Sequence, residues 1–139
     1  MKTSVKLFIC VVFISAIASC TKNPYKILRS KDGSWTATTE TTYPGFGTII
    51  TTSTMNFYTG SATVIDTAGN QSGFEWVYNT KSAQIVATNY VGDFIYETIY
   101  KVSDITDDSE KWTFKEFQID GVTQSTSDDY TSVISLERK

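Results

Sequence analysis

Two cysteines are the only thiols in this sequence that could serve as nucleophiles or thiolate metal ligands. They are Cys10 and Cys20, and the 139 residues include no histidine. Ser-His-Asp and Cys-His catalysis, the usual zinc sites and the ordinary pH switch near neutrality depend on that imidazole. We therefore expect a protein that is not an enzyme, with no catalytic residues, no metal site and no cofactor.

Carboxylates are the other groups with chemical potential, and they gather in two polar segments. The segments contain Asp104, Asp107, Asp108 and Glu110 in one case and Asp128 with Asp129 in the other. Calcium prefers oxygen ligands, but this spacing does not follow an EF-hand loop and lacks its glycine. Glycoside hydrolysis needs two acids facing each other across a cleft, whereas these acids fall mainly in expected loops. We interpret both clusters as solvated polar turns.

Cys20 closes a segment with the layout of a secretory signal. Lys2 and Lys6 give a basic start, residues 7–14 are almost wholly apolar, and Ile17-Ala18-Ser19-Cys20 brings small residues up to the cysteine. The apolar run is too short for a permanent membrane span. The last four residues resemble the bacterial lipobox, which implies cleavage before Cys20 and a lipid on its thiol. A plain signal peptide with a chance cysteine is the alternative.

The lipobox resemblance implies an anchor to a membrane. Each buried acyl methylene contributes about 0.8 kcal/mol, so the three chains of a mature bacterial lipoprotein would hold it stably. Thr21 stands where an Asp often signals retention at the inner membrane, which favours the outer membrane. Thr21-Lys22-Asn23-Pro24 also lacks the acidic run that resembles a surface-export signal. We expect the periplasmic face, with surface exposure as the alternative.

Length and charge indicate one modest domain. We divide the chain into a signal peptide at residues 1–19, a lipidated tether with a short helical segment at 20–32, and a β domain at 33–139. Removing residues 1–19 takes two of the twelve basic residues and none of the fifteen acidic ones, which leaves a net charge of −5. An acidic chain with scattered basic residues is a poor candidate for binding nucleic acid.

A short helix is predicted between the tether and the domain. Asn23 can cap it, Pro24 suits its first position, and Gly33 lies beyond its end. Ile27 and Leu28 would then be free to plug one end of a β structure. A flexible spacer is the alternative.

The domain itself reads as strands, because it is rich in threonine and turn residues break it at short intervals. The predicted strands cover residues 35–43, 48–58, 62–66, 74–79, 83–90, 94–105, 111–119 and 130–137. Phe74, Trp76 and Tyr78 share one face, as strand alternation requires. Phe117 falls opposite Trp112, so we expect a bulge near Glu116. Eight hairpin-linked strands predict an all-β, antiparallel up-and-down barrel, and a two-sheet sandwich is the alternative.

Gly33-Ser34-Trp35 resembles the G-x-W signature that opens the first strand of the lipocalins and of the lipocalin-like lipoproteins of the Bacteroidota. The resemblance implies that Trp35 closes the barrel bottom and that Arg138 lies over its ring, a contact of about 0.5–2 kcal/mol. The family's later Thr-Asp-Tyr turn has no clear counterpart, since Asp128-Asp129-Tyr130-Thr131 leads into the last strand instead. The disulfide common in secreted lipocalins is also missing.

The resemblance and the aromatic face together imply a ligand. An eight-stranded barrel can hold one small molecule or be filled by its own side chains. The aromatic residues expected to line a cavity for a small apolar ligand are Phe57, Trp76, Tyr78, Phe94, Tyr96, Trp112 and Phe114. They could equally pack on one another as an ordinary core.

Two functions remain open from the sequence. The first is a membrane-anchored, lipocalin-like lipoprotein that binds a small apolar ligand at the outer membrane. The alternative is a non-catalytic accessory or interaction subunit of an outer-membrane protein assembly. The loop Tyr43-Pro44-Gly45-Phe46-Gly47 is read either as a contact patch or as a simple turn.

Overall fold

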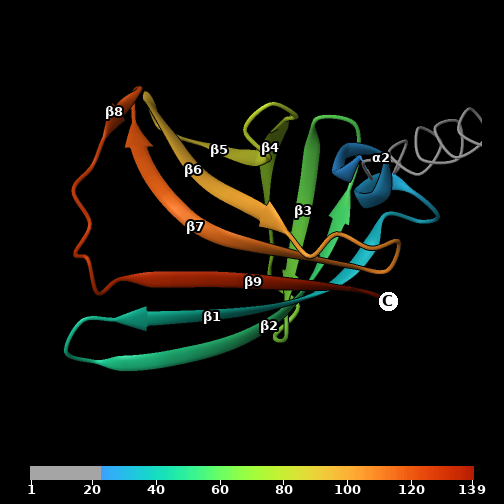
Figure 1. The fold of residues 1–139 in the computed structure, drawn as a ribbon, viewed down its shortest axis with the longest axis horizontal. Coiled ribbons are helices and arrows are strands. Elements are labelled where there is room, and N and C mark those ends of the chain that lie inside the picture. Colours follow the sequence, from blue (N-terminus) through green and yellow to red (C-terminus); the bar gives the residue numbers. More distant parts are fainter. Residues whose placement is uncertain (1–22) are drawn as a thin grey trace, which may run out of the picture.

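The described part of the chain, residues 23–139, forms a closed antiparallel β-barrel with one short helix in a computed structural model (Figure 1). The expectations for the signal peptide, the lipobox and Cys20 lie outside these residues. The all-β, lipocalin-like barrel predicted from strand alternation is confirmed. No helix of the described residues is long and apolar enough to cross a bilayer.

The elements follow one another through short turns. They are α2 (Pro24–Arg29), β1 (Ser34–Tyr43), β2 (Gly47–Phe57), β3 (Ser61–Asp66), β4 (Gln71–Asn79), β5 (Gln84–Val91), β6 (Phe94–Ser103), β7 (Ser109–Ile119), β8 (Val122–Thr123) and β9 (Thr131–Arg138). The eight long strands match the predicted ones within a few residues at each end. Strand β8 was not predicted. It consists of two residues that pair with the end of β7, and it is too short for a sequence pattern to reveal.

The barrel closes because β6, at one end of the row of paired strands, also pairs with β7 near the other end. Strands β1 to β6 pair in sequence order, β6 pairs with β7, and β9 bridges β7 to β1. This ring excludes the two-sheet sandwich. Between β6 and β7 the register shifts, since Ile99 faces Glu116 but Tyr100 faces Phe114. Lys115 is the extra residue, so the bulge predicted near Glu116 is confirmed.

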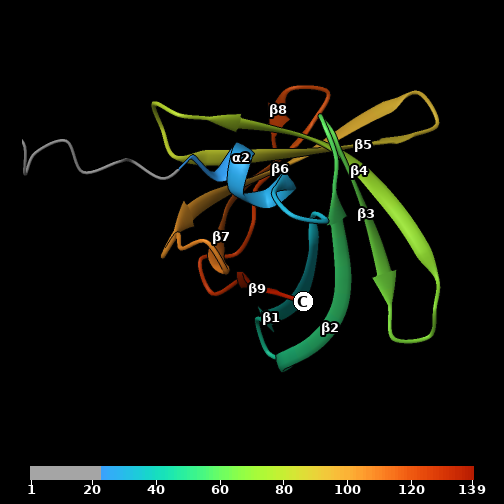
Figure 2. The same cartoon turned by 90° about the vertical axis from the view of Figure 1, so that its right-hand side faces the viewer.

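Helix α2 lies across one end of the barrel, beside the carboxyl end of the chain (Figure 2). The Asn23 side chain accepts a hydrogen bond from the Tyr25 amide at 3.0 Å, and Pro24 occupies the first turn. The predicted cap and helix are thus confirmed, and the alternative of a flexible spacer is excluded for residues 24–29. Leu28 is fully buried and Ile27 packs against the core, so the helix plugs this end.

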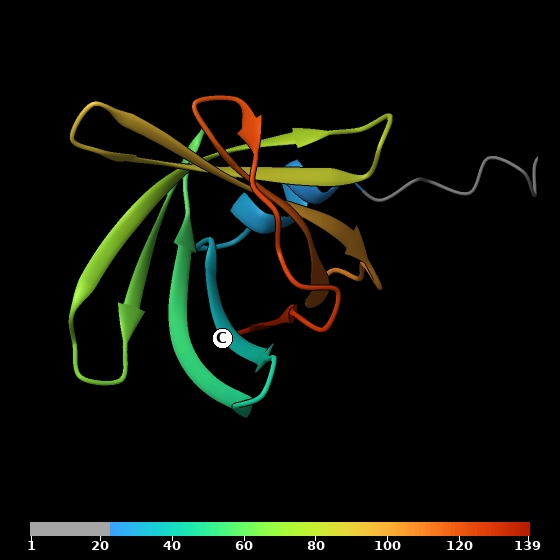
Figure 3. The ribbon, with the colours of Figure 1, turned by 90° about the vertical axis from the view of Figure 1, so that its left-hand side faces the viewer.

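The opposite end of the barrel is less tightly joined. Strand β4 pairs with β5 only from Glu75 to Asn79, whereas β3–β4 pairing continues to Gln71 and β5–β6 pairing continues to Val91. The β3–β4 and β5–β6 hairpins therefore diverge beyond Glu75, as the view onto this end shows (Figure 3). We call this divergence the fork.

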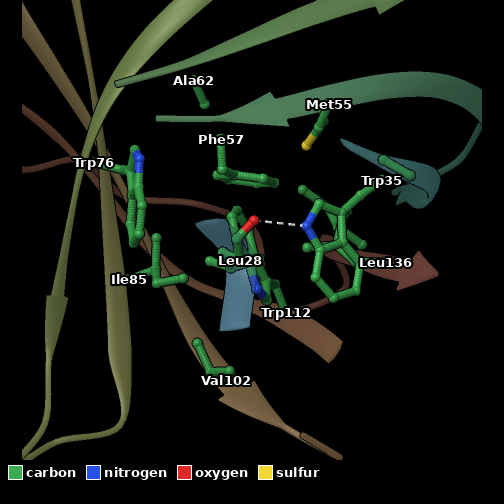
Figure 4. Packing of buried hydrophobic residues seen from close by; sticks show 12 residues of the cluster. Leu28, Trp35, Met55, Phe57, Ala62, Trp76, Ile85, Val102, Trp112 and Leu136 are labelled. Carbon is green, nitrogen blue, oxygen red and sulfur yellow. Dashed lines mark hydrogen bonds between the residues drawn. The ribbon is translucent and has the colours of Figure 1, made fainter. Parts of the chain in front are cut away.

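The apolar core fills the half of the barrel nearest α2. All three tryptophans are at most 1% exposed and pack with Leu28, Phe57 and Ile85 (Figure 4). Burying side chains of this size is the main stabilising contribution to a domain that has no disulfide among its described residues. The half beyond the core is less tightly packed and includes the hollow lined by Met55, Phe74 and Asn89.

Candidate functional site

The end of the barrel at α2 is sealed by Trp35 and Arg138. The Trp35 indole N–H donates to the Leu28 carbonyl oxygen at 2.9 Å (Figure 4). The Arg138 guanidinium carbon lies 3.9 Å from the centroid of the Trp35 ring. Arg138 also donates to the carbonyl oxygens of Ile27 at 3.1 Å and Ser30 at 2.9 Å, which ties the last strand to the helix.

Gly33 is needed where β1 begins because another strand passes close to it. Its φ is +68°, and a Cβ there would stand 2.6 Å from the Phe57 carbonyl oxygen. The Phe57 amide donates to the Gly33 carbonyl oxygen at 2.9 Å. The glycine of the G-x-W triplet thus lets β1 approach β2 while Trp35 turns inward.

One carboxyl group is buried beside this seal. Glu110 is only 2% exposed, opposite Leu136 in the β7–β9 pairing, so its interpretation as part of a solvated turn was wrong. The Trp112 indole N–H donates to its Oε2 at 3.0 Å, while Oε1 has no partner among the described residues. Burial raises the pKa of Glu110 to about 7, opposed by the Trp112 hydrogen bond and the Arg138 charge.

The prediction failed at Glu110 because β7 begins two residues earlier than expected. Glu110 and Trp112 are two apart, so in one strand they must point to the same, inward face. In a run of polar residues, a glutamate of a strand cannot be distinguished from one of a solvated turn until the position where the strand begins is known.

Above the core lies an inner cavity of about 250 Å³. Its floor includes Met55, Trp112 and Ile134, and its side toward the fork includes Asn89 and Gly73. The complete lining is Met55, Val64, Ser72, Gly73, Phe74, Ala87, Asn89, Thr98, Tyr100, Trp112 and Ile134. No charged side chain is among them, so the cavity suits an uncharged group.

A second hollow of about 370 Å³ lies on the other side of Tyr100, under the segment that follows β8. It is lined by Thr98, Tyr100, Phe114, Phe117, Thr126 and Tyr130. Thr98 and Tyr100 line both spaces. Burial raises the pKa of Tyr100 to about 12, so its hydroxyl stays neutral and can donate a hydrogen bond at any physiological pH.

The structure places the seven aromatic candidates in three regions of the barrel: the core, the linings of the two hollows, and the open end. Phe57 and Trp76 pack in the core with ring centroids 5.6 Å apart, and Tyr78 is half-buried near Glu110. Trp112 and Phe114 line the inner cavity and the second hollow, respectively. Phe94 is 54% exposed at the start of β6, where its ring lies 6.5 Å from that of Tyr96.

Other lining residues were not singled out from the sequence. Phe74 was placed on the same face as Trp76, but nothing in alternation indicated that Phe74 or Tyr100, rather than Trp76, borders vacant space. Phe117 lines the second hollow because the Lys115 bulge turns it inward. Tyr130 precedes the last strand and reaches the hollow through its ring contact with Phe114 at 5.0 Å.

Apolar side chains are also exposed around the open end. Phe46 at the β1–β2 turn is 90% exposed, and Ile49 and Ile50 follow it on β2. Further members lie at the β5–β6 and β7–β8 turns, namely Tyr90, Val91, Phe94, Ile95 and Val122. We call these residues the apolar rim. Exposed apolar side chains gathered at the turns of one end of a barrel can mark an interaction site.

The described residues contain no group of three or more acidic, cysteine or histidine side chains that could hold a metal ion. Comparison with known proteins returned no matching protein-family model, no matching curated protein and no matching solved structure.

Proposed function

We propose that this chain is a lipid-anchored, lipocalin-like lipoprotein of a bacterial outer membrane that holds a small, uncharged, largely apolar ligand in the open half of its barrel. The observation that carries the proposal is the inner cavity, which is uncharged and lies over a tightly packed floor. Protein sites for small molecules are typically apolar hollows with a few polar groups.

The sealed end supports binding at the other end. Among the described residues, Trp35, Arg138 and Leu28 pack together and close the barrel at α2. A ligand must therefore reach the inner cavity from the open end or through the wall. The barrel binds and releases without chemical change, in keeping with a sequence that has no histidine.

The anchor is proposed on the sequence alone. Lipidation of Cys20, cleavage before it and an outer-membrane location, on the periplasmic face, follow from the lipobox resemblance and from Thr21. Mass spectrometry of the amino-terminal peptide from host membranes tests this directly. A peptide that begins at an acylated Cys20 is expected, and one that begins elsewhere without acyl chains would contradict the anchor.

The ligand is tested by purifying the full lipoprotein from its own host in mild detergent. Native mass spectrometry is expected to show an additional small mass bound to the folded chain, released on unfolding into organic solvent. Repeated preparations with no bound molecule would contradict the binding function.

The apolar rim favours a second candidate, an accessory subunit of an outer-membrane protein assembly. Crosslinking in native membranes would recover a stable protein partner, and replacing Phe46 and Ile50 with serine would release it. Val77→Ser, an exposed apolar position outside the rim, is the matched control. An unchanged crosslinked partner in the rim variant would contradict this role.

A further inference from the structure

The inner cavity shares lining residues with a groove at the fork. A groove of about 340 Å³ lies in the fork, lined by Ser61, Ala62, Gly73, Phe74, Glu75, Thr88, Asn89 and Tyr90. Gly73, Phe74 and Asn89 line this groove and also the inner cavity. The same three residues therefore border both spaces, at the place where β4 and β5 stop pairing.

Gly73 lines both spaces and presents no side chain to either. Its φ is not in the left-handed range, so no turn requires glycine here, and a Cβ would meet only the Ala62 carbonyl oxygen at 3.1 Å. Glycine in the interior of a strand weakens it and often marks a place where another group approaches closely. The group that approaches Gly73 is the Ala62 carbonyl oxygen of β3, and the lack of a side chain at Gly73 leaves the groove and the inner cavity next to each other.

The two ends of this passage differ in chemistry. Its deep end meets Met55, Trp112 and Ile134, which offer apolar surface. Its outer end has Thr88, Asn89 and Glu75, which offer hydrogen-bonding groups and one carboxylate. The Tyr90 hydroxyl donates to Glu75 Oε2 at 3.0 Å across the start of the fork, and no basic side chain lines the groove.

Size also favours a molecule that occupies both spaces. At about 250 Å³ the inner cavity falls below the 300–1,000 Å³ typical of complete small-molecule sites. A slender apolar chain could fill it while its polar end remained in the groove. An anionic end would stand beside the Glu75 carboxylate without a compensating cation, which is unfavourable at short range.

We propose that the fork is a lateral portal for a single-chain amphiphile with a neutral, hydroxyl-bearing head, its apolar chain in the inner cavity and its head in the groove beside Glu75, Thr88 and Asn89. This inference rests on the proposed function and specifies its ligand class and the route of binding. The second hollow beyond Tyr100 and the apolar rim have no part in it.

Photolabelling in host outer membranes tests the portal with the full lipoprotein. The probes are monoacylglycerols that carry a diazirine either at the chain terminus or next to the ester, and a free fatty acid of the same length with a terminal diazirine. We expect the terminal diazirine to label Met55, Trp112 or Ile134 and the ester-proximal one to label Thr88, Asn89 or Tyr90. The anionic fatty acid should label the cavity at least fivefold less.

Two variants at exposed positions distinguish entry through the portal from entry through the second hollow. Asn89→Trp blocks the passage and should reduce labelling of the cavity at least fivefold. Thr126→Trp places the same bulk at the second hollow and should leave labelling within twofold of the wild type. Both side chains are exposed, and matching thermal unfolding curves would establish that each variant folds.

The outcomes distinguish the portal from the proposed function. Equal labelling by acid and monoacylglycerol, reversed positions of the two diazirines, or a loss in Thr126→Trp but not in Asn89→Trp would overturn the portal while leaving a ligand in the barrel. Absence of label from every cavity residue, together with no co-purifying molecule, would overturn the binding function itself.

Discussion

The Arg138 guanidinium lies 3.9 Å above the Trp35 ring, and so joins the first and last strands of the barrel. The same guanidinium donates to the carbonyl oxygens of Ile27 and Ser30, while the Trp35 N–H donates to that of Leu28. One arginine and one tryptophan therefore hold helix, first strand and last strand together. The open half of the barrel can be left less tightly packed because this end is fixed.

Trp35→Ala should cost about 3–5 kcal/mol of unfolding free energy, because it removes a fully buried indole and leaves a cavity. Urea titration measures the change. Val77→Ala, at a position 66% exposed on β4, is the control and should change stability by less than about 0.5 kcal/mol. A loss below about 1 kcal/mol for Trp35→Ala would mean that this ring does not close the barrel.

Arg138→Lys should cost about 1.5–3 kcal/mol although it keeps the charge, because a lysine cannot replace the planar set of donors to Ile27 and Ser30. Arg29→Lys is the matched control, since the Arg29 guanidinium also lies over an aromatic ring, 4.1 Å from the Tyr25 centroid, but its hydrogen bonds are to the helix and to the β2–β3 turn rather than to the last strand. Equal losses of unfolding free energy in the two variants would show that the seal depends on charge alone.

Gly33→Ala should destabilise the barrel more than Gly69→Ala. Both positions have positive φ, which costs an alanine about 1–2 kcal/mol. Only at Gly33 does the added Cβ also overlap a backbone atom, the Phe57 carbonyl oxygen, for which overpacking adds about 1–3 kcal/mol. Thermal and urea unfolding of the pair measure the difference, and equal losses would show that β1 moves freely away from β2.

The Glu110 carboxyl should make stability fall between about pH 4.5 and pH 7. Its pKa is about 7 in the folded barrel and 4.5 in the unfolded chain, so the folded state binds the proton more tightly. Its contribution is complete below pH 4.5 and is lost as pH rises through 7. A shift of this size corresponds to about 3 kcal/mol as an upper bound, since each pKa unit is 1.36 kcal/mol.

Glu110→Gln removes this titration. The variant should be more stable than the wild type at pH 8, and the advantage should disappear by pH 4.5, as measured by urea titrations across that range. Asp66 and Glu116 have lowered pKa values through their hydrogen bonds, so their effects fall at lower pH and do not obscure the window. Parallel pH profiles for wild type and variant would contradict a buried, protonated Glu110.

Much of the barrel follows from local patterns in the chain. Alternation placed Trp76 on one face with Phe74 and Tyr78, and the structure buries Trp76 to 1% exposure. The misfit of Phe117 with Trp112 indicated a bulge that the structure has at Lys115. Asn23 and Pro24 specified the helix through chemistry that involves only neighbouring residues. Such features depend on short-range sterics and hydrogen bonding, which the sequence contains directly.

The site was harder to predict. Alternation indicates whether a side chain faces the inside or the outside of the barrel, but not its position along the barrel axis. Trp76 and Phe94 both point to the inward face of their strands, yet one is 1% exposed in the core and the other is 54% exposed at the open end. The fork depends on where β4 and β5 stop pairing, a property of two strands together. Gly73 lies just before the strand predicted at residues 74–79, and only the structure, in which β4 begins at Gln71, places it inside a strand.

Filling the inner cavity tests the central proposal most directly. Ala87 lines the cavity and is 7% exposed, whereas the side chain of its neighbour Val86 points to the opposite face of β5. Native mass spectrometry of Ala87→Phe and Val86→Phe lipoproteins, purified from host membranes and both shown to be folded, compares the two. The account predicts that Val86→Phe retains the bound molecule and that Ala87→Phe loses at least nine-tenths of it. Equal occupancy in both variants would contradict a ligand in the barrel.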